Sequence, residues 1–291
     1  MIGPSRAVWK EWTAWLQGES SLDFRLYNYT FEDMQRRMRQ QAAHGVTIQW
    51  IIERNQFART GDWFLALQKQ FAWQPSFQLQ ADDNLHVEFQ HAKTFVWEKH
   101  FIIQTANSTY SSFNANREAF FFGEDIGIVA TLRALFSADW AGESLYSVKM
   151  DPDIVVCPVN CRSRVESLLQ QAQQSIVMYE QYIDDPHIQS ILVKKHAEGV
   201  NMRIILGASE TGNSAATTQF LKTLSSSVKF QPKPYVHAKV ILIDNQFLLI
   251  GSMNISATSL DKNREIGILL LDPKQIRTVL YPFEKDRAKS N

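Results

Sequence analysis

The sequence predicts an α/β protein made of two similar halves. A motif with the spacing N-x4-S-x3-N-R-E begins at Asn107 and again at Asn254, 147 positions later. The triplet His91-Ala92-Lys93 likewise returns as His237-Ala238-Lys239. Segments typical of strands and of amphipathic helices surround both copies in the same order. Self-similarity over this length indicates a duplicated unit whose two copies share one fold.

The expected elements follow the same order in both halves. Runs of β-branched and aromatic residues predict strands, and apolar residues at helical spacing predict helices. Gly45 and Gly199 each stand where a helix would end before a strand begins. The expected pairs are strands at 22–29 and 175–183, helices at 32–43 and 187–196, and strands at 46–52 and 200–206.

The two His-x-Lys segments are expected to lie on strands as well. In the second half, apolar runs at 240–243 and 247–250 flank an Asp-Asn-Gln turn and predict a hairpin after the motif. A helix at 126–140 would close the first half, and a strand at Val155-Val156 with a helix at about 163–174 would open the second. The expected division is a first lobe at 1–140, a connector at 141–153 and a second lobe at 154–291.

The composition excludes several classes of protein. Hydrophobic residues make up 45% of the 291 positions, which is enough for a real core and excludes a disordered chain. The 30 basic residues balance the 30 acidic ones, so the net charge does not indicate a strongly anionic partner. The N-terminus lacks a signal-peptide pattern, and no apolar run is long enough to span a bilayer. We therefore expect a soluble protein without a transmembrane segment.

The two cysteines, Cys157 and Cys161, are four positions apart. They are too few for a disulfide framework, and no companion metal ligands stand near them. We expect both to be reduced thiols. Reduced thiols in turn predict a cytoplasmic location.

The repeated His-x-Lys motif is suited to phosphodiester chemistry. Residues two apart on a strand point to the same face, so each motif holds an imidazole beside an ammonium group. Displacing a group from a phosphodiester requires a nucleophile, a proton for the departing oxygen, and positive or N–H groups around the phosphoryl oxygens. Two His-Lys pairs and two asparagines supply these groups.

The second half resembles the HKD signature of the phospholipase D superfamily. The matching residues are His237, Lys239, Asp244, Gly251, Ser252 and Asn254. The first half departs from the pattern in three ways: Glu98 stands in place of Asp, Gln104-Thr105 replaces Gly-Ser, and the segment between Lys93 and Asn107 is one residue shorter. The resemblance extends over nearly the whole chain. It implies two similar α/β/α lobes related by a pseudo-twofold axis, with one active site between them.

The resemblance also implies a role for each motif residue. One histidine attacks phosphorus and the other protonates the departing alcohol; we assign His91 as nucleophile and His237 as acid. Lys93 and Lys239 complete the catalytic set, and no metal or other cofactor is expected. The supporting roles are of three kinds: phosphate binding by Asn107, Asn254, Thr105 and Ser252, orientation of the histidines by Glu118 and Glu265, and support of the motif by Glu98 and Asp244.

The expected function is metal-independent phosphodiester cleavage through a phosphohistidine. The preferred substrate is a phospholipid, whose head group would be hydrolysed or transferred as by a phospholipase D or cardiolipin synthase, with peripheral membrane contact. Two alternatives stay open: an endonuclease of the same superfamily acting on DNA or RNA, and an inactive binding module. The chain is expected to act as a monomer.

Overall fold

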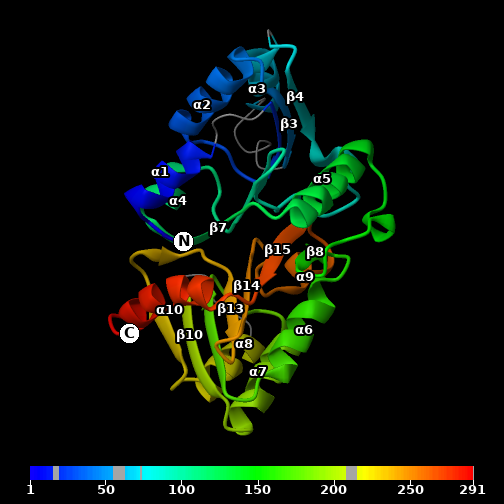
Figure 1. Cartoon of the computed structure of the whole chain (residues 1–291). Helices are drawn as coiled ribbons and strands as arrows, with labels where there is room; N and C mark the ends of the chain where they lie inside the picture. The colour runs from blue at the N-terminus through cyan, green and yellow to red at the C-terminus, as the bar shows by residue number, and fades with distance from the viewer. Residues whose placement is uncertain (16–19, 55–62, 73, 208–214, 291) are drawn as a thin grey trace.

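The computed structural model describes residues 1–15, 20–54, 63–72, 74–207 and 215–290. The chain folds into two α/β halves, each built on one mixed sheet, as the sequence predicts. Figure 1 shows the N-terminal half above the C-terminal half, with the long helix α5 (Ile126–Ala141) and the connector after it at one side. Both chain ends lie near the junction of the halves.

The two sheets have the same strand order. The first runs β4-β3-β2-β5-β6-β7-β1, and the second runs β11-β10-β9-β13-β14-β15-β8. The strands β2, β3 and β4 are parallel, as are β9, β10 and β11, whereas the other neighbours are antiparallel. The bounds in the first sheet are β1 Ile2–Gly3, β2 Ser21–Leu26, β3 Thr47–Ile52, β4 Phe77–Ala81, β5 Thr94–Val96, β6 Phe101–Gln104 and β7 Asn116–Gly123. Those in the second are β8 Ile154–Cys157, β9 Ser175–Glu180, β10 Asn201–Gly207, β11 Val228–Gln231, β13 Val240–Ile243, β14 Phe247–Gly251 and β15 Glu265–Leu270.

The helices also form equivalent pairs. Gly45 and Gly199 follow α2 and α7 with φ values of 87° and 86°, the left-handed conformation that a glycine adopts without strain. Asp125 caps the start of α5 by accepting a hydrogen bond from the backbone N–H of Ile128 at 3.0 Å. The pairs are α1 Arg6–Ala14 with α6 Cys161–Gln171, α2 Glu32–Ala43 with α7 Pro186–Ala197, α3 Trp63–Phe71 with α8 Ala215–Thr223, α4 Tyr110–Asn114 with α9 Ala257–Asp261, and α5 with α10 Pro273–Arg287.

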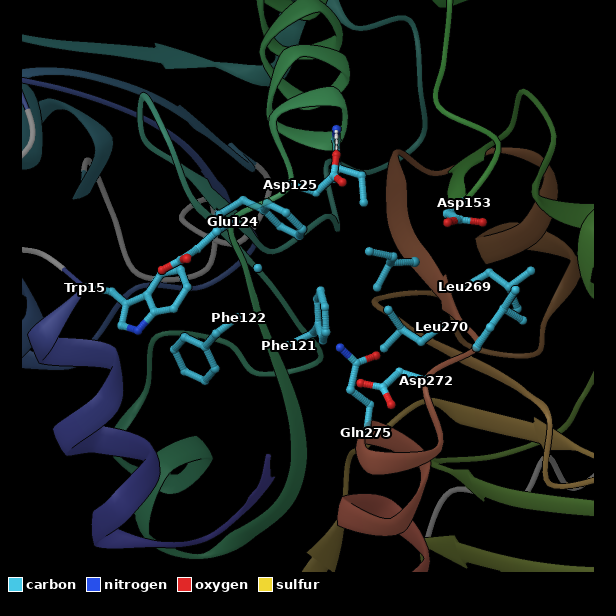
Figure 2. A pocket seen from close by; sticks show the side chains of 15 residues that line it. Trp15, Phe121, Phe122, Glu124, Asp125, Asp153, Leu269, Leu270, Asp272 and Gln275 are labelled. Carbon is cyan, nitrogen blue, oxygen red and sulfur yellow. Dashed lines mark hydrogen bonds between the residues drawn. The ribbon is translucent and has the colours of Figure 1, made fainter.

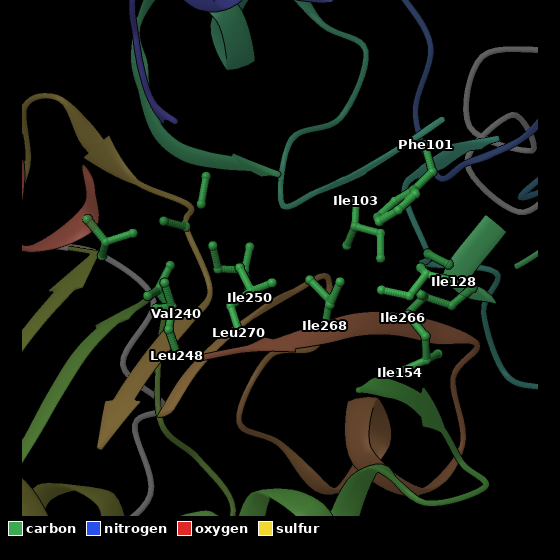
Figure 3. Packing of buried hydrophobic residues seen from close by; sticks show 14 of the residues in the cluster. Phe101, Ile103, Ile128, Ile154, Val240, Leu248, Ile250, Ile266, Ile268 and Leu270 are labelled. Carbon is green, nitrogen blue, oxygen red and sulfur yellow. The ribbon is translucent and has the colours of Figure 1, made fainter. Parts of the chain in front are cut away.

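Apolar side chains from both sheets form the core between the halves. Figure 3 shows Phe101 and Ile103 of β6 facing Val240, Ile250 and their neighbours across the junction. Their exposed fractions are 2% or less. Each such side chain contributes about 1.5–3 kcal/mol when fully buried, so the core holds the two halves in one fixed arrangement.

Short backbone pairings also connect the halves next to the His-x-Lys motifs. The strand β12 (Tyr235–Val236) pairs with Asn116 and Arg117 of β7, and Gln90 forms the equivalent bridge to Arg264. The motifs themselves end just before β5 and β13, so the prediction that they lie on strands is wrong by a few residues. The reason is that the backbone N–H of each motif histidine donates to the opposite half, from His91 to Arg264 and from His237 to Arg117, instead of to its own sheet.

The expectation of two reduced cysteines is wrong. Cys157 ends β8 and Cys161 begins α6, and the turn between them brings the two Cα atoms to 4.7 Å, within the range that a disulfide requires. The structure joins the two residues by a disulfide. The argument from reduced thiols to a cytoplasmic location therefore no longer holds.

Candidate active site

The two His-x-Lys motifs lie at the junction of the halves, each held by the opposite half. The backbone N–H of His91 donates to the carbonyl of Arg264 at 2.9 Å, and that of His237 donates to the carbonyl of Arg117 at 3.0 Å. Within each motif the lysine Nζ donates to the carbonyl of its own histidine at 2.5 Å. Because Arg117 and Arg264 directly precede Glu118 and Glu265, each histidine is brought next to the glutamate of the other half.

The histidines and glutamates are paired across the junction. Nδ1 of His91 lies 2.9 Å from Glu265, and Nδ1 of His237 lies 2.8 Å from Glu118. Both glutamates are fully buried, whereas the histidine side chains are 12% and 13% exposed. An ionised carboxylate can only accept, so each Nδ1–H donates and each Nε2 keeps its lone pair. Neither half contains a complete site, because each needs the other's glutamate.

The pKa values favour ionised glutamates and neutral histidines. Burial lowers the pKa of His91 to about 4, and the opposing attraction of Glu265 only partly offsets this. Burial lowers the pKa of His237 as well, against the attraction of Glu118. Burial acts to raise the pKa of Glu118 and Glu265, but the paired histidine, a nearby lysine and a hydroxyl donor together outweigh it and leave each pKa below its usual range. A neutral imidazole with a free Nε2 is the form that a nucleophile requires.

Lys93 interacts electrostatically with charged residues of both halves. Burial lowers its pKa to about 7; Glu265 and Glu118 act to raise the pKa and Lys239 acts to lower it. These interactions place both lysines and both glutamates in one electrostatic cluster. At neutral pH Lys93 is therefore close to losing its positive charge.

This pKa predicts an alkaline loss of activity. We expect kcat/KM for a phosphodiester substrate to fall by up to about tenfold per pH unit above pH 7, because the charged form of Lys93 then becomes the minor one. A pH profile of kcat/KM measures the effect, since a phosphodiester has no titration of its own in this range. Lys93→Arg stays charged and should flatten the alkaline limb. An unchanged limb in that variant would assign the titration to another group.

Hydroxyl and amide groups support the buried glutamates. Thr105 Oγ1 donates to Glu118, and Ser259 Oγ donates to Glu265 at 2.6 Å. Asn263 Nδ2 adds a second donor to Glu265 at 3.2 Å. Ser252 Oγ accepts the backbone N–H of Ile266 at 3.1 Å, in the position equivalent to the bond from Ala119 to Thr105. The structure thus engages Thr105 and Ser252 with the strands that carry the glutamates, and their predicted role in phosphate binding stays a prediction.

The role of Ser259 and Asn263 was missed by sequence reasoning, although both belong to the repeated motif. Their repetition was the available signal. The side-chain oxygens of the two asparagines predicted to bind phosphate have no partner in the described part of the protein. Oδ1 of Asn107 and Oδ1 of Asn254 are buried and have no hydrogen-bond partner among the described residues. Their predicted role as phosphate ligands stays a prediction.

The two residues predicted to support the motifs behave differently. Asp244 accepts the backbone N–H groups of Gln173, Gln174 and Ser175 at 2.9, 2.8 and 2.7 Å, which fixes the β13–β14 turn to the start of β9. Burial acts to raise the pKa of Asp244, but these three bonds outweigh it and lower the pKa. Glu98 is exposed and accepts a hydrogen bond from the Ser20 hydroxyl.

Replacing Asp244 is expected to destabilise the fold without altering the reacting groups. Asp244→Ala should lower the free energy of unfolding by about 2–3 kcal/mol, because three backbone donors lose a charged acceptor. Denaturant unfolding measures the loss. The lowered pKa means that this contribution is present above the unfolded pKa and is lost as pH falls through the folded one. Glu98→Ala is the matched control, and an equal loss there would contradict the assignment.

Two buried ion-pair clusters hold the glutamate-bearing strands in place. Asp139 at the end of α5 binds Arg25 of β2 at 3.0 Å and Arg264 at 3.1 Å, and all three side chains are 6% exposed or less. At the equivalent place in α10, Asp286 accepts from Arg117 at 2.7 Å and from the Tyr179 hydroxyl at 2.5 Å. The first cluster joins α5 to Arg264, which directly precedes the strand with Glu265. The second joins α10 to Arg117, which directly precedes Glu118 in β7.

A separate groove lies at the junction, away from the histidines. Figure 2 shows Trp15, Phe121 and Phe122 on one side and Leu270 with Gln275 on the other. None of the His-x-Lys residues lines it. Among the described ranges, no group of three His, Cys, Asp or Glu side chains is arranged to hold a metal ion. No helix in the described part of the chain is long and apolar enough to cross a membrane.

Two matched halves that each complete the other's His-Lys-Glu site define a duplicated phospholipase D-like protein. The chain belongs to the family described as cardiolipin synthase, PLD-like domain, whose model matches residues 16–140 and 165–287. The expected superfamily and fold class are therefore confirmed.

Two relatives agree with this family, and a solved structure agrees with the fold. A phospholipase D of Rickettsia conorii is 27% identical over 134 residues, which is 46% of this chain and 67% of the relative. A cardiolipin synthase of Halalkalibacterium halodurans is 25% identical over 189 residues, 56% of this chain and 38% of that protein. The fold is similar to that of phosphatidylserine synthase from Haemophilus influenzae, with a TM-score of 0.71 at 15% identity, covering 99% of this chain and 85% of the other.

Proposed function

We propose that this protein cleaves or transfers the head group of a phospholipid at one metal-independent site shared by both halves. The observation that carries the proposal is the crossed pairing of His91 with Glu265 and of His237 with Glu118. The names of the matched family and relatives support a phospholipid substrate over a nucleic acid. The balanced net charge agrees, because it provides no general attraction for nucleic acid.

The proposed reaction has two displacements at phosphorus. In the first, Nε2 of His91 attacks and forms a P–N bond, while the P–O bond to the head group breaks and protonated His237 gives its proton to the departing oxygen. In the second, neutral His237 takes a proton from water or an acceptor alcohol, whose oxygen attacks phosphorus and displaces His91. The anionic substrate favours the protonated form of His237 needed in the first step.

The remaining residues bind and orient in this scheme. Lys93, Lys239, Asn107 and Asn254 would surround the phosphoryl oxygens, where two ammonium groups offset the charge that develops in the transition state. Glu118 and Glu265 hold each imidazole by Nδ1 and direct Nε2 toward phosphorus, as a buried carboxylate does for other catalytic histidines.

A substrate panel in EDTA tests the proposal. Vesicles of phosphatidylglycerol and of phosphatidylcholine, single- and double-stranded DNA, and RNA are incubated with the protein at equal concentration. We expect release of a lipid head group with EDTA present and no cleavage of the nucleic acids. Degradation of DNA or RNA that weakens with added salt would favour the endonuclease alternative. Failure on every substrate would favour the inactive binding module.

A further inference from the structure

The two halves of the site differ at the residue opposite each motif lysine. Arg25 pairs with Thr94 and Tyr179 pairs with Val240, so the next step of each antiparallel ladder sets Leu26 opposite Lys93 and Glu180 opposite Lys239. Directly opposed residues share a face of the sheet and have Cβ atoms about 5 Å apart. At equivalent places, one lysine therefore faces an alkyl side chain and the other a carboxyl group.

Glu180 is a buried carboxyl group to which the proposed chemistry assigns no role. It is 1% exposed, and its Oε2 has no hydrogen-bond partner among the described residues. Burial raises its pKa well above the usual range, and Lys239 only partly offsets this. A neutral carboxyl group can both donate and accept a hydrogen bond, which suits it to a hydroxyl ligand.

The positions next to Leu26 and Glu180 also differ: they are less polar in the first half than in the second. In the first half, the Tyr27 ring packs against the His91 imidazole at 4.6 Å and against Phe89 at 6.4 Å. The equivalent residues in the second half are Gln181 and Tyr235, and Gln181 Nε2 donates to the Tyr235 hydroxyl at 3.1 Å. The first half thus presents aromatic rings where the second presents an amide and a phenol.

The first half also contains a buried carboxylate, which lies next to the chain that leads into His91. Glu53, which directly follows β3, is fully buried, and its Oε2 accepts the backbone N–H of Gln90 at 2.6 Å. This bond commits Glu53 to holding the chain that leads into His91. The equivalent position in the second half is Gly207, where an added Cβ would lie 3.0 Å from the carbonyl of Val236. Glu180 therefore has no counterpart with the same function in the first half.

We propose that Glu180, Gln181 and Tyr235 form a polar subsite beside His237 that binds the hydroxyl groups of an uncharged, glycerol-like head group. This inference rests on the proposed function. A departing alcohol held there lies next to the acid that protonates it, and phosphorus faces His91 on the aromatic side. The two histidines have nearly equivalent surroundings, and the subsite decides their roles: His237 acts as the acid and His91 as the nucleophile.

The charges at the site favour a polyol over an ammonium head group. Glu118 and Glu265 are already paired with the histidines, and Glu53 is bonded to the backbone N–H of Gln90. Burial favours the neutral form of Glu180, so these four carboxyl groups leave no unpaired negative charge for a quaternary ammonium. Such a cation would instead prefer the rings of Tyr27 and Phe89 on the His91 side. The preference for one head group over the other therefore shows whether the head group binds on the His237 side or on the His91 side.

The test compares three substrates: phosphatidylglycerol, phosphatidylcholine, and an aryl phosphodiester whose leaving group carries no hydroxyl. We expect the unmodified protein to prefer phosphatidylglycerol over phosphatidylcholine. Glu180→Leu, which copies Leu26, should lower kcat/KM on phosphatidylglycerol by about 10- to 100-fold, mainly through KM, and change the aryl substrate by less than about 3-fold. Glu180→Gln should recover most of the loss. Tyr235→Phe, which removes one hydroxyl, should lower kcat/KM on phosphatidylglycerol by about 2- to 10-fold.

The controls separate this inference from the proposed function. Glu198→Leu, an exposed glutamate after α7, should leave all three rates unchanged, and thermal unfolding of each variant checks the fold. If the aryl substrate is turned over but Glu180→Leu lowers all three rates equally or none, the subsite is wrong and the proposed function stands. A preference for phosphatidylcholine also rejects the subsite. If the unmodified protein cleaves none of the three, both proposals are wrong.

Discussion

His91→Ala is expected to lower phosphodiester turnover by about 10⁴-fold or more, because the proposed covalent route has no other nucleophile. The side chain is held by Glu265 through Nδ1, and its lowered pKa keeps Nε2 unprotonated across the physiological pH range. Initial rates on a phospholipid and on an aryl phosphodiester measure the effect. Both substrates should lose activity, because both need the same attack on phosphorus.

The matched variant His237→Ala should discriminate between the two substrates. An alkyl alcohol needs a proton to depart, whereas an aryl oxide with a low pKa leaves without one. Release of the first aryl product should therefore survive in His237→Ala, and lipid cleavage should fall by about 10²- to 10⁴-fold. His44→Ala, at an exposed turn, serves as the histidine control. Equal losses on both substrates in both variants would contradict the separate roles.

Asp139→Ala is expected to give the largest loss of stability, about 3–5 kcal/mol. The substitution leaves the guanidinium groups of Arg25 and Arg264 without their shared carboxylate at sites that are 6% exposed or less. An uncompensated buried charge is costly because the protein interior solvates it poorly. The midpoint of denaturant unfolding measures the loss. Asp139→Asn retains a hydrogen-bond acceptor and should lose less, so it remains measurable if the alanine variant does not fold.

Asp33→Ala is the control for this prediction. Its ion pair with Arg36 is solvent-exposed on both sides, so the change in stability should stay below about 1 kcal/mol. Equal unfolding midpoints for the Asp33 and Asp139 variants would show that the buried cluster contributes nothing to stability.

The repeat made the fold predictable from sequence, and it singled out the residues of the candidate site. A 147-residue offset that recovers Asn107, Glu118 and their partners needs two equivalent folds, and the two identical strand orders agree with that. The expected helix at 32–43 matches α2 because its apolar residues, buried as Met34, Met38 and Ala42, recur at helical spacing.

The crossed pairing could not be predicted in the same way. A repeat states that Glu118 and Glu265 are equivalent, but not whether each serves its own histidine or the other. The bonds that decide this run from His91 and His237 to Arg264 and Arg117 of the opposite half, and no local pattern marks them.

Two further features could not be predicted from spacing: one depends on long-range packing and the other on the shape of a turn. The equivalence of Asp139 and Asp286 was present in the sequence at the same 147-residue offset, yet their arginine partners come from strands far along the chain. Cys157 and Cys161 stand only four positions apart, but their approach depends on a turn whose shape their spacing does not specify. Spacing therefore identified chemical groups more reliably than it identified their partners.

Trapping the covalent intermediate tests the central claim most directly. His237→Ala is mixed with an aryl phosphodiester in EDTA, so that the first step proceeds while the base for the second is missing. We predict a burst of one aryl product per protein molecule, with the phosphoryl group found by mass spectrometry on the peptide that contains His91. No burst, or a phosphoryl group on any other residue, would contradict the account.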